Sequence, residues 1–331
     1  MVSPFVMRPM TLERETPSVR FVTPCAKTPR RCDNRKVTSA PTSQHLTVRD
    51  GVSLRALQWS APNESPGIPI VLIHGLASNA RLWDGPARLL SEMGHAVVAI
   101  DLRGHGLSDK PDHGYAMSDI AADVNDVLDA LVQQQRKWAN PLILGQSWGG
   151  NIVVEVAHQF GHKIRGAVAV DGGTIELQKA FPEWDECKHA LTPPALAGMS
   201  YERLRSYIRA AHLDWSEEAI DGQMYNMEHL ADGTIKPWLT LERHLTVLRG
   251  LWEHSPSLLW NKISVPILFT PAARGNDEHT VVKRAQIQHA LDQLPKSRVE
   301  WFDPADHDLH AQFPDRFAAV VNDAITSGFF S

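Results

Sequence analysis

One short stretch, residues 142–150, constrains the fold more than any other part of this chain of 331 residues. The apolar run from Leu142 has the length of a strand and breaks at Gly145, and a helical pattern begins at Asn151. Between them lies Gly-Gln-Ser-Trp-Gly, with Ser147 at its centre. A sharp strand-to-helix turn crowds its neighbours, so residues without a Cβ fit beside it. The stretch therefore predicts a strained turn that presents Ser147 at the start of a helix, where backbone N–H groups favour negative charge.

The bulk properties of the chain narrow its class. Its length allows one large α/β domain with a sizeable core. The net charge of −5 is mild, and no basic stripe suggests nucleic acid. No run approaches the roughly 18 apolar residues of a membrane span. The three cysteines, Cys25, Cys32 and Cys187, show no metal-binding spacing and do not require an oxidising compartment. We expect a soluble cytoplasmic protein, monomeric or a small homo-oligomer, without nucleic-acid or membrane partners.

Residues 1–43 differ from the rest of the chain. Prolines and arginines recur there, and no apolar periodicity survives. Such a segment cannot bury enough surface to offset the entropy of ordering it. We expect a disordered N-terminal extension, with order beginning near Gln44.

Strands and helices then alternate along the chain. Residues 45–49 and 52–59 predict a β-hairpin around Asp50-Gly51. Continuous apolar runs predict buried strands, and amphipathic stretches between them predict helices. The predicted strands after the hairpin are 68–73, 96–100, 142–144, 164–170, 265–270 and 298–302. This alternation indicates a mostly parallel sheet with helices on both faces, formed by residues 44–173 and 262–331.

The alternation stops between residues 174 and 261. Helical stripes there run from Tyr201 to Ala211 and from Leu241 to Trp252, and Ser216 before two glutamates is typical of a helix N-cap. This segment is predicted to be a helical insertion that covers the edge of the sheet.

With these elements placed, the chain resembles the α/β-hydrolase superfamily over roughly residues 45–330. The resemblance is carried by His74-Gly75, by Asp101-x-Arg103-Gly104-x-Gly106-x-Ser108, by the Gly145–Gly149 elbow, and by Asp306-His307-Asp308-Leu309-His310. It implies an eight-stranded, mostly parallel sheet flanked by helices, with a helical cap inserted between strands 6 and 7.

The chemistry of a serine hydrolase needs a base and a carboxylate besides the serine. Imidazole has a pKa near 6.5 and suits the removal of the serine proton. The resemblance assigns this role to His307, with His310 as a packing residue and His74 as a further competitor. The residues around His307 match no zinc spacing, so we expect neither a metal nor a cofactor.

Two aspartates qualify as the acid that orients the imidazole. Asp277 matches the family's usual position after the seventh strand, and we favour it. Asp171, which ends the sixth strand, is the alternative. Both lie between Ser147 and His307, so chain order does not decide. The loop before Asp277 is longer than usual, because residues 271–274 intervene after the strand.

The resemblance places the two oxyanion-hole N–H groups on Leu76 and Trp148. The Trp148 ring lines a pocket or packs in the core, and both interpretations stay open. Asp101, Arg103 and Ser108 are expected to be structural, as a charge pair and turn residues that brace the loop after the fourth strand.

These features favour hydrolysis of a carboxylic ester or lactone of a small, largely apolar substrate through an acyl-enzyme. Serine at the elbow argues against epoxide opening and halide removal, whose enzymes carry aspartate there. Carbon–carbon bond hydrolysis, acyl transfer and cofactor-free peroxidation use the same triad and stay open as alternatives. A different class is a small-ligand receptor with weak or no turnover. Turnover of an ester separates the receptor from the enzymes.

Overall fold

The computed structural model describes residues 40–61 and 67–331. The predicted disordered extension falls almost entirely on residues 1–39, outside the described residues. The first strand begins at Thr42, two residues before the predicted start of order at Gln44.

Eight strands form one sheet in the order β1-β2-β4-β3-β5-β6-β9-β10. The first two form the predicted antiparallel hairpin, and β2 is also antiparallel to β4. All other pairs are parallel, as the alternation of strands and helices predicts. The strands are β1 (Thr42–Thr47), β2 (Ser53–Trp59), β3 (Pro69–Ile73), β4 (Ala96–Ile100), β5 (Leu142–Gln146), β6 (Gly166–Val170), β9 (Ile267–Thr270) and β10 (Ser297–Val299).

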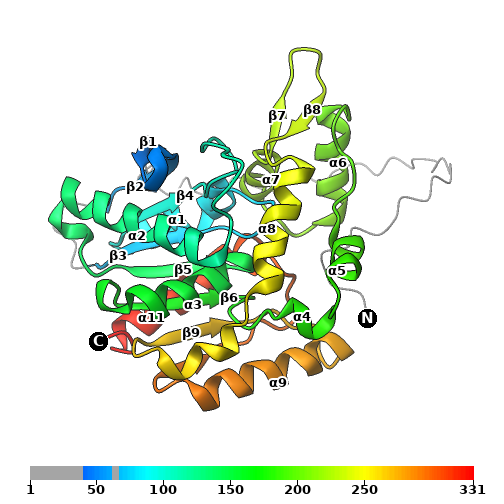
Figure 1. Ribbon diagram of the computed structural model, residues 1–331. Coiled ribbons are helices and arrows are strands. Elements are labelled where there is room, and N and C mark those ends of the chain that lie inside the picture. The colour runs from blue at the N-terminus through cyan, green and yellow to red at the C-terminus, as the bar shows by residue number, and fades with distance from the viewer. Residues whose placement is uncertain (1–39, 62–66) are drawn as a thin grey trace, which may run out of the picture.

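Helices cover both faces of this sheet (Figure 1). Buried side chains of α1 and α11 pack with one set of strand residues, and those of α2, α3 and α9 pack with the other. The central strands are apolar on both faces because both faces are covered. These helices are α1 (Asp84–Glu92), α2 (Met117–Gln134), α3 (Trp148–Phe160), α9 (Glu278–Gln293) and α11 (Pro314–Thr326), with the short α10 (Leu309–Gln312) before the last.

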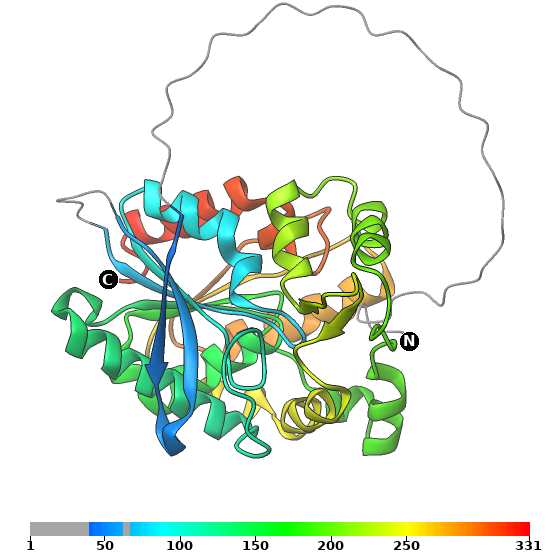
Figure 2. The same cartoon turned by 90° about the horizontal axis from the view of Figure 1, so that it is seen from above.

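The segment 174–261, which we call the cap, stands between β6 and β9 in the chain. Its elements gather on one side of the sheet in both views (Figures 1 and 2). The predicted helices α6, α7 and α8 are present, and the Ser216 side chain accepts the Ala219 N–H as an N-cap. The short hairpin β7–β8 has no counterpart among the predicted elements. The cap elements are α4 (Leu177–Ala180), α5 (Trp184–Leu191), α6 (Tyr201–Ala211), α7 (Glu217–Met224), β7 (Met227–His229), β8 (Ile235–Pro237) and α8 (Leu241–Glu253).

Buried polar contacts attach the cap to the core. Asn79 Nδ2 donates to the Gly222 carbonyl at 2.9 Å and to Asn226 Oδ1 at 2.7 Å. At the far end of α8, His254 Nε2 lies 2.9 Å from Glu155 Oε2 of α3. Buried groups of this kind need partners, so these contacts fix where the cap sits. None of the helices in residues 40–61 and 67–331 is long and apolar enough to cross a membrane.

Strand register sets the position of the site. Ile73 of β3 pairs with Gly145 of β5, and Gln146 pairs with Val170 of β6. Since parallel strands end at the same edge, the residues that follow them come together there. That edge therefore brings Ser147 beside Asp171.

The loop after β4 is braced by two buried ion pairs, but their partners differ from the predicted charge pair. Arg55 Nε donates to Asp101 Oδ2 at 2.7 Å. Arg103 does not pair with Asp101; its guanidinium donates to both oxygens of Asp123 in α2, at 2.5 and 2.6 Å. Ser108 Oγ donates to the Asp101 carbonyl at 2.6 Å, so all three predicted residues are structural.

Breaking the Arg103–Asp123 pair is expected to destabilise the fold. Both side chains are fully buried, so Arg103→Met leaves the Asp123 carboxylate without its cation. We predict a fall of about 3–5 kcal/mol in the free energy of unfolding, measured by urea denaturation. The control is Lys163→Met, which removes the cation of a partly exposed pair with Asp129 and should cost about 1 kcal/mol or less. Equal effects of the two variants would contradict a buried, tightly coupled pair.

Candidate active site

Ser147 occupies the predicted strained turn between β5 and α3. Its backbone has φ 55° and ψ −116°, an uncommon conformation for a residue with a side chain. A Cβ on Gly145 would lie 2.0 Å from the Gly149 carbonyl oxygen, so the turn closes only with glycine there. Ser147 Oγ is buried and accepts or donates no hydrogen bond among the described residues. The fold therefore holds this hydroxyl at the sheet edge without assigning it to a structural contact.

The loop after β6 packs directly on this turn. A Cβ on Gly172 would lie 2.2 Å from the Ser147 carbonyl oxygen, so only glycine allows the two backbones to approach this closely. Asn151 of α3 holds the same loop: its Oδ1 accepts the Gly173 N–H at 2.9 Å, and its Nδ2 donates to the Ile175 carbonyl at 2.8 Å. This role of Asn151 could not be predicted from the sequence, because a single amide in a helix forms no pattern.

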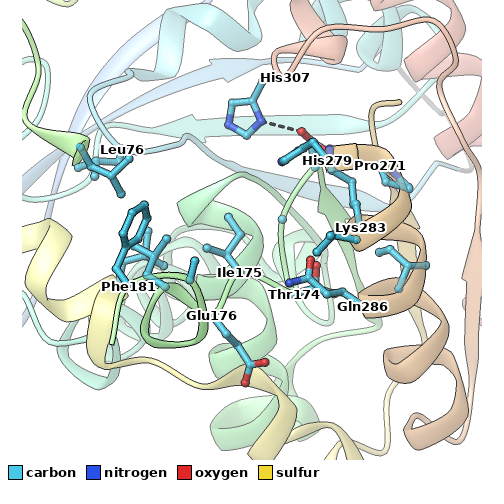
Figure 3. A pocket seen from close by; sticks show the side chains of 18 of the residues that line it. Leu76, Thr174, Ile175, Glu176, Phe181, Pro271, His279, Lys283, Gln286 and His307 are labelled. Carbon is cyan, nitrogen blue, oxygen red and sulfur yellow. Dashed lines mark hydrogen bonds and ion pairs between the residues drawn. The ribbon is translucent and has the colours of Figure 1, made fainter. Parts of the chain in front are cut away.

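The structure brings His307 together with Asp171 and not with the favoured Asp277. His307 Nδ1 lies 2.6 Å from Asp171 Oδ2, the contact drawn as a dashed line in Figure 3. The Asp171 side chain is 3% exposed and that of His307 19%. Next to Ser147, Gln146 Nε2 donates to the His307 carbonyl at 3.3 Å and holds the histidine loop at the elbow.

Asp277 instead caps a helix, which corrects the sequence-based choice. It is the N-cap of α9, and its Oδ1 accepts the Thr280 N–H at 2.7 Å. The extra residues after β9 explain the difference. Ala272 bridges to Phe302, and Ala273 N–H donates to the Phe302 carbonyl, so the chain continues extended beside the segment that follows β10. The longer loop noted in the sequence was the signal for this change.

The pKa values of Asp171 and His307 follow from the geometry of their contact. Burial raises the pKa of Asp171, but the His307 hydrogen bond and the nearby Lys283 charge lower that pKa more, to about 2. Burial lowers the pKa of His307, yet the hydrogen bond and charge of Asp171 leave that pKa above its usual 6.5. Asp171 is therefore a carboxylate at neutral pH, and it favours the protonated imidazole.

The two histidines that compete with His307 in the sequence, His74 and His310, have structural surroundings. His74 Nδ1 lies 2.7 Å from the Gly75 carbonyl oxygen, and its Nε2 accepts the Leu102 N–H at 3.0 Å. His310 is buried, with its ring 4.1 Å from that of Trp83, as expected for a packing residue. Among residues 40–61 and 67–331, no group of three or more His, Cys, Asp or Glu could hold a metal ion.

The two residues expected to supply oxyanion-hole N–H groups both lie at this edge. Leu76 follows Gly75, whose added Cβ would meet Ser147 Cβ at 3.3 Å, and Trp148 is the first residue of α3. The Trp148 ring packs in the core, with its Nε1 3.2 Å from Met117 Sδ. This decides the interpretation that the sequence left open.

A cavity of about 530 Å³ lies beside the pair. In Figure 3, His307 stands at its upper end, Leu76 and Phe181 lie to the left, and Lys283 and Gln286 lie to the right. Most of the wall is apolar and comes from the loop after β6, from α4, from α8 and from α9. The apolar lining residues are Leu76, Ile175, Leu177, Ala180, Phe181, Leu191, Leu248, Leu251, Pro271, Val282 and Ile287.

Comparison with known proteins agrees with this architecture. A family model described as "Alpha/beta hydrolase family" matches residues 70–320. The chain is 24% identical to a non-heme chloroperoxidase of Streptomyces lividans, over 82% of this chain and 95% of that protein. It is 27% identical to the esterase YbfF of Escherichia coli K12, over 79% of this chain and 94% of the esterase.

Solved structures share the fold. The crystal structure of E-2-(acetamidomethylene)succinate hydrolase superposes with a TM-score of 0.72 at 20% identity, over 86% of this chain and 99% of the other. A thioesterase domain from the curacin biosynthetic pathway gives 0.67 at 21% identity, over 86% and 100%. The sheet, the elbow and the family match together lead to one conclusion: the chain belongs to the α/β-hydrolase family.

Proposed function

We propose that the protein is a serine hydrolase that cleaves a carboxylic ester or lactone of a small, largely apolar substrate through an acyl-enzyme. Ser147 is the nucleophile, His307 the general base and Asp171 the orienting acid. The observation that carries the proposal is the 2.6 Å contact between His307 Nδ1 and Asp171 Oδ2 at the sheet edge where the elbow presents Ser147. The similarity to esterase YbfF, which extends over most of this chain, supports the proposed ester hydrolysis.

The acylation step follows from these roles. As Ser147 Oγ attacks the carbonyl carbon, His307 Nε2 takes the hydroxyl proton and Asp171 accepts the Nδ1–H. The carbonyl electrons move to oxygen, where the N–H groups of Leu76 and Trp148 stabilise the negative charge, each by about 3 kcal/mol. Collapse of this intermediate expels the alkoxide, which receives the proton from His307. Water then attacks the acyl-enzyme with His307 as base, and Ser147 recovers its proton.

The shape of the cavity supports the apolar substrate class. Its volume of about 530 Å³ suits a small molecule, and apolar side chains of the cap, of α9 and of the loops at the sheet edge form most of its wall. Substrates with an extended apolar acyl or alcohol group gain from burial there, by about 25 cal/mol for each Å² removed from water.

Cofactor-free peroxidation is a second candidate, favoured by the named activity of the Streptomyces relative. With acetic acid as the acyl donor, Ser147 takes the acetyl group and water leaves. Hydrogen peroxide then attacks the acyl-enzyme in place of water, which releases a peracid and restores Ser147, and the peracid oxidises halide in solution. Halogenation of monochlorodimedone with acetate, peroxide and bromide, lost in Ser147→Ala, would support this activity.

The triad roles predict a specific ranking of variants. Ser147→Ala should abolish both labelling by a fluorophosphonate probe and turnover of p-nitrophenyl butyrate. Asp171→Asn should lower kcat about 10⁴-fold, because the amide cannot hold the imidazole in the productive tautomer. Asp277→Asn should retain kcat within about tenfold, since asparagine also caps a helix and Asp277 is not the acid. The reverse order of the two aspartate variants would contradict the assignment.

The pH dependence follows from the pKa of His307. Protonated imidazole cannot act as a base, so turnover is present above the pKa of His307 and is lost as the pH falls through it. Because that pKa is raised above 6.5, the acid limb of kcat/KM should have its midpoint above pH 6.5. Rates of p-nitrophenyl butyrate hydrolysis from pH 5 to 9, with the Ser147→Ala rate subtracted at each pH, test this. A midpoint below 6.5 would show that Asp171 does not raise the basicity of the imidazole.

A further inference from the structure

A lysine from α9 shares the carboxylate that holds the imidazole. Lys283 Nζ lies 2.6 Å from Asp171 Oδ1 and donates to the Ala272 carbonyl at 2.8 Å. Oδ1 also accepts the Ala272 N–H at 2.9 Å, while Oδ2 faces His307. One oxygen of the acid thus bonds to an ammonium and an amide, and the other to the imidazole.

This contact is partly buried although α9 is largely exposed. The Lys283 side chain is 14% exposed, whereas its neighbours Val282 and Arg284 are exposed. A lysine on such a helix can keep its charge in water by extending along the surface. Here the side chain turns inward beside the cavity, as Figure 3 shows for the labelled Lys283. Burying an ammonium is costly unless it is paired, and its partner is the proposed catalytic acid.

We propose that Lys283 is a positioning residue of the reactive centre: its ammonium fixes the Asp171 carboxylate with Oδ2 toward His307, and its charge weakens the hold of that carboxylate on protonated imidazole. The inference rests on the proposed roles of Asp171 and His307. It separates two effects of the acid. Lys283 strengthens the orientation of the imidazole by Asp171. It also reduces the stabilisation that Asp171 gives to the inactive, protonated imidazole.

The directions of the pKa shifts of His307 and Asp171 agree with these two effects of Lys283. Desolvation lowers the pKa of His307, Asp171 and Asp308 raise it, and Lys283 lowers it. Lys283 also lowers the pKa of Asp171, so the acid stays charged throughout the working range. With Lys283 removed, the imidazole would hold its proton to a higher pH.

The remaining titratable groups around His307 do not produce the same effect. Those from its own loop, from α9 and from the cap are Asp306, Asp308, His310, His279 and His212. Burial lowers the pKa of His310 to about 3 and that of His279 below 6.5, so both are mostly neutral above pH 6.5. Asp306 pairs with Arg274. Lys283 differs from these groups because its Nζ contacts Asp171 directly and its charge lowers the pKa of His307.

The test compares pH profiles of kcat/KM for p-nitrophenyl butyrate. Lys283→Met removes the charge with a side chain of similar length, and the acid limb should move to higher pH by about 1 unit. Its plateau should fall less than that of Asp171→Asn, because the imidazole keeps its partner. Lys283→Arg restores a cation and should return the limb toward the wild-type position. Lys163→Met removes an equal charge from a partly exposed pair outside the cavity and should leave the limb in place.

A purely structural lysine would give a different result. It would lower stability or kcat in Lys283→Met without moving the acid limb, and that outcome overturns the inference. Thermal unfolding of each variant identifies loss of folding. If Lys283→Met does not fold, Lys283→Gln makes the same comparison with a polar, neutral side chain; if neither neutral variant folds, the lysine is a structural tie and the inference fails. Wild-type turnover that does not depend on Ser147 would overturn the proposed function, whereas an unshifted limb with Ser147-dependent turnover overturns only the role of Lys283.

Discussion

The parallel register of β5 and β6 is the constraint on which the site depends. Pairing of Gln146 with Val170 makes the next residue of each strand a neighbour at the sheet edge. The backbone there is packed so closely that a Cβ on Gly172 would overlap the Ser147 carbonyl. A shift in this register would separate the serine from the aspartate. It would also replace Gly172 with a residue that has a Cβ, which does not fit beside the turn at Ser147. The position of the serine relative to the aspartate is thus set by the core of the sheet.

Most of the fold could be predicted from the sequence because it follows from local pattern. Apolar runs of strand length identified the sheet, and the spacing of apolar residues identified the cap helices. The hairpin β7–β8 was missed because each strand has only three residues, too few for an alternating pattern. The partners of Asp101 and Arg103 were also beyond reach. Arg55 and Asp123 lie far along the chain from them, and a single sequence does not show which distant charges meet.

The site was predictable to the extent that it depends on motifs. The turn at Ser147 and the histidine after the last strand have strong local signatures. The partner of His307 depends instead on where the chain goes after β9. Residues 271–273 continue in an extended path beside Phe302, so Asp277 begins a helix, and a residue count after the strand could not reveal that path. Lys283 carried no signal at all, because a lysine on an exposed helix is ordinarily solvated.

In the proposed arrangement the acid follows β6, so the connection between β9 and α9 carries no reactive group. This connection and the first turns of α9 then form part of the cavity wall, and α9 carries Lys283. Residues 274–277 of this connection are exposed, so its length and sequence have room to change. Substrate selectivity could therefore diverge, or be engineered, through this one surface loop while the hydrolytic chemistry on the neighbouring strands is inherited intact.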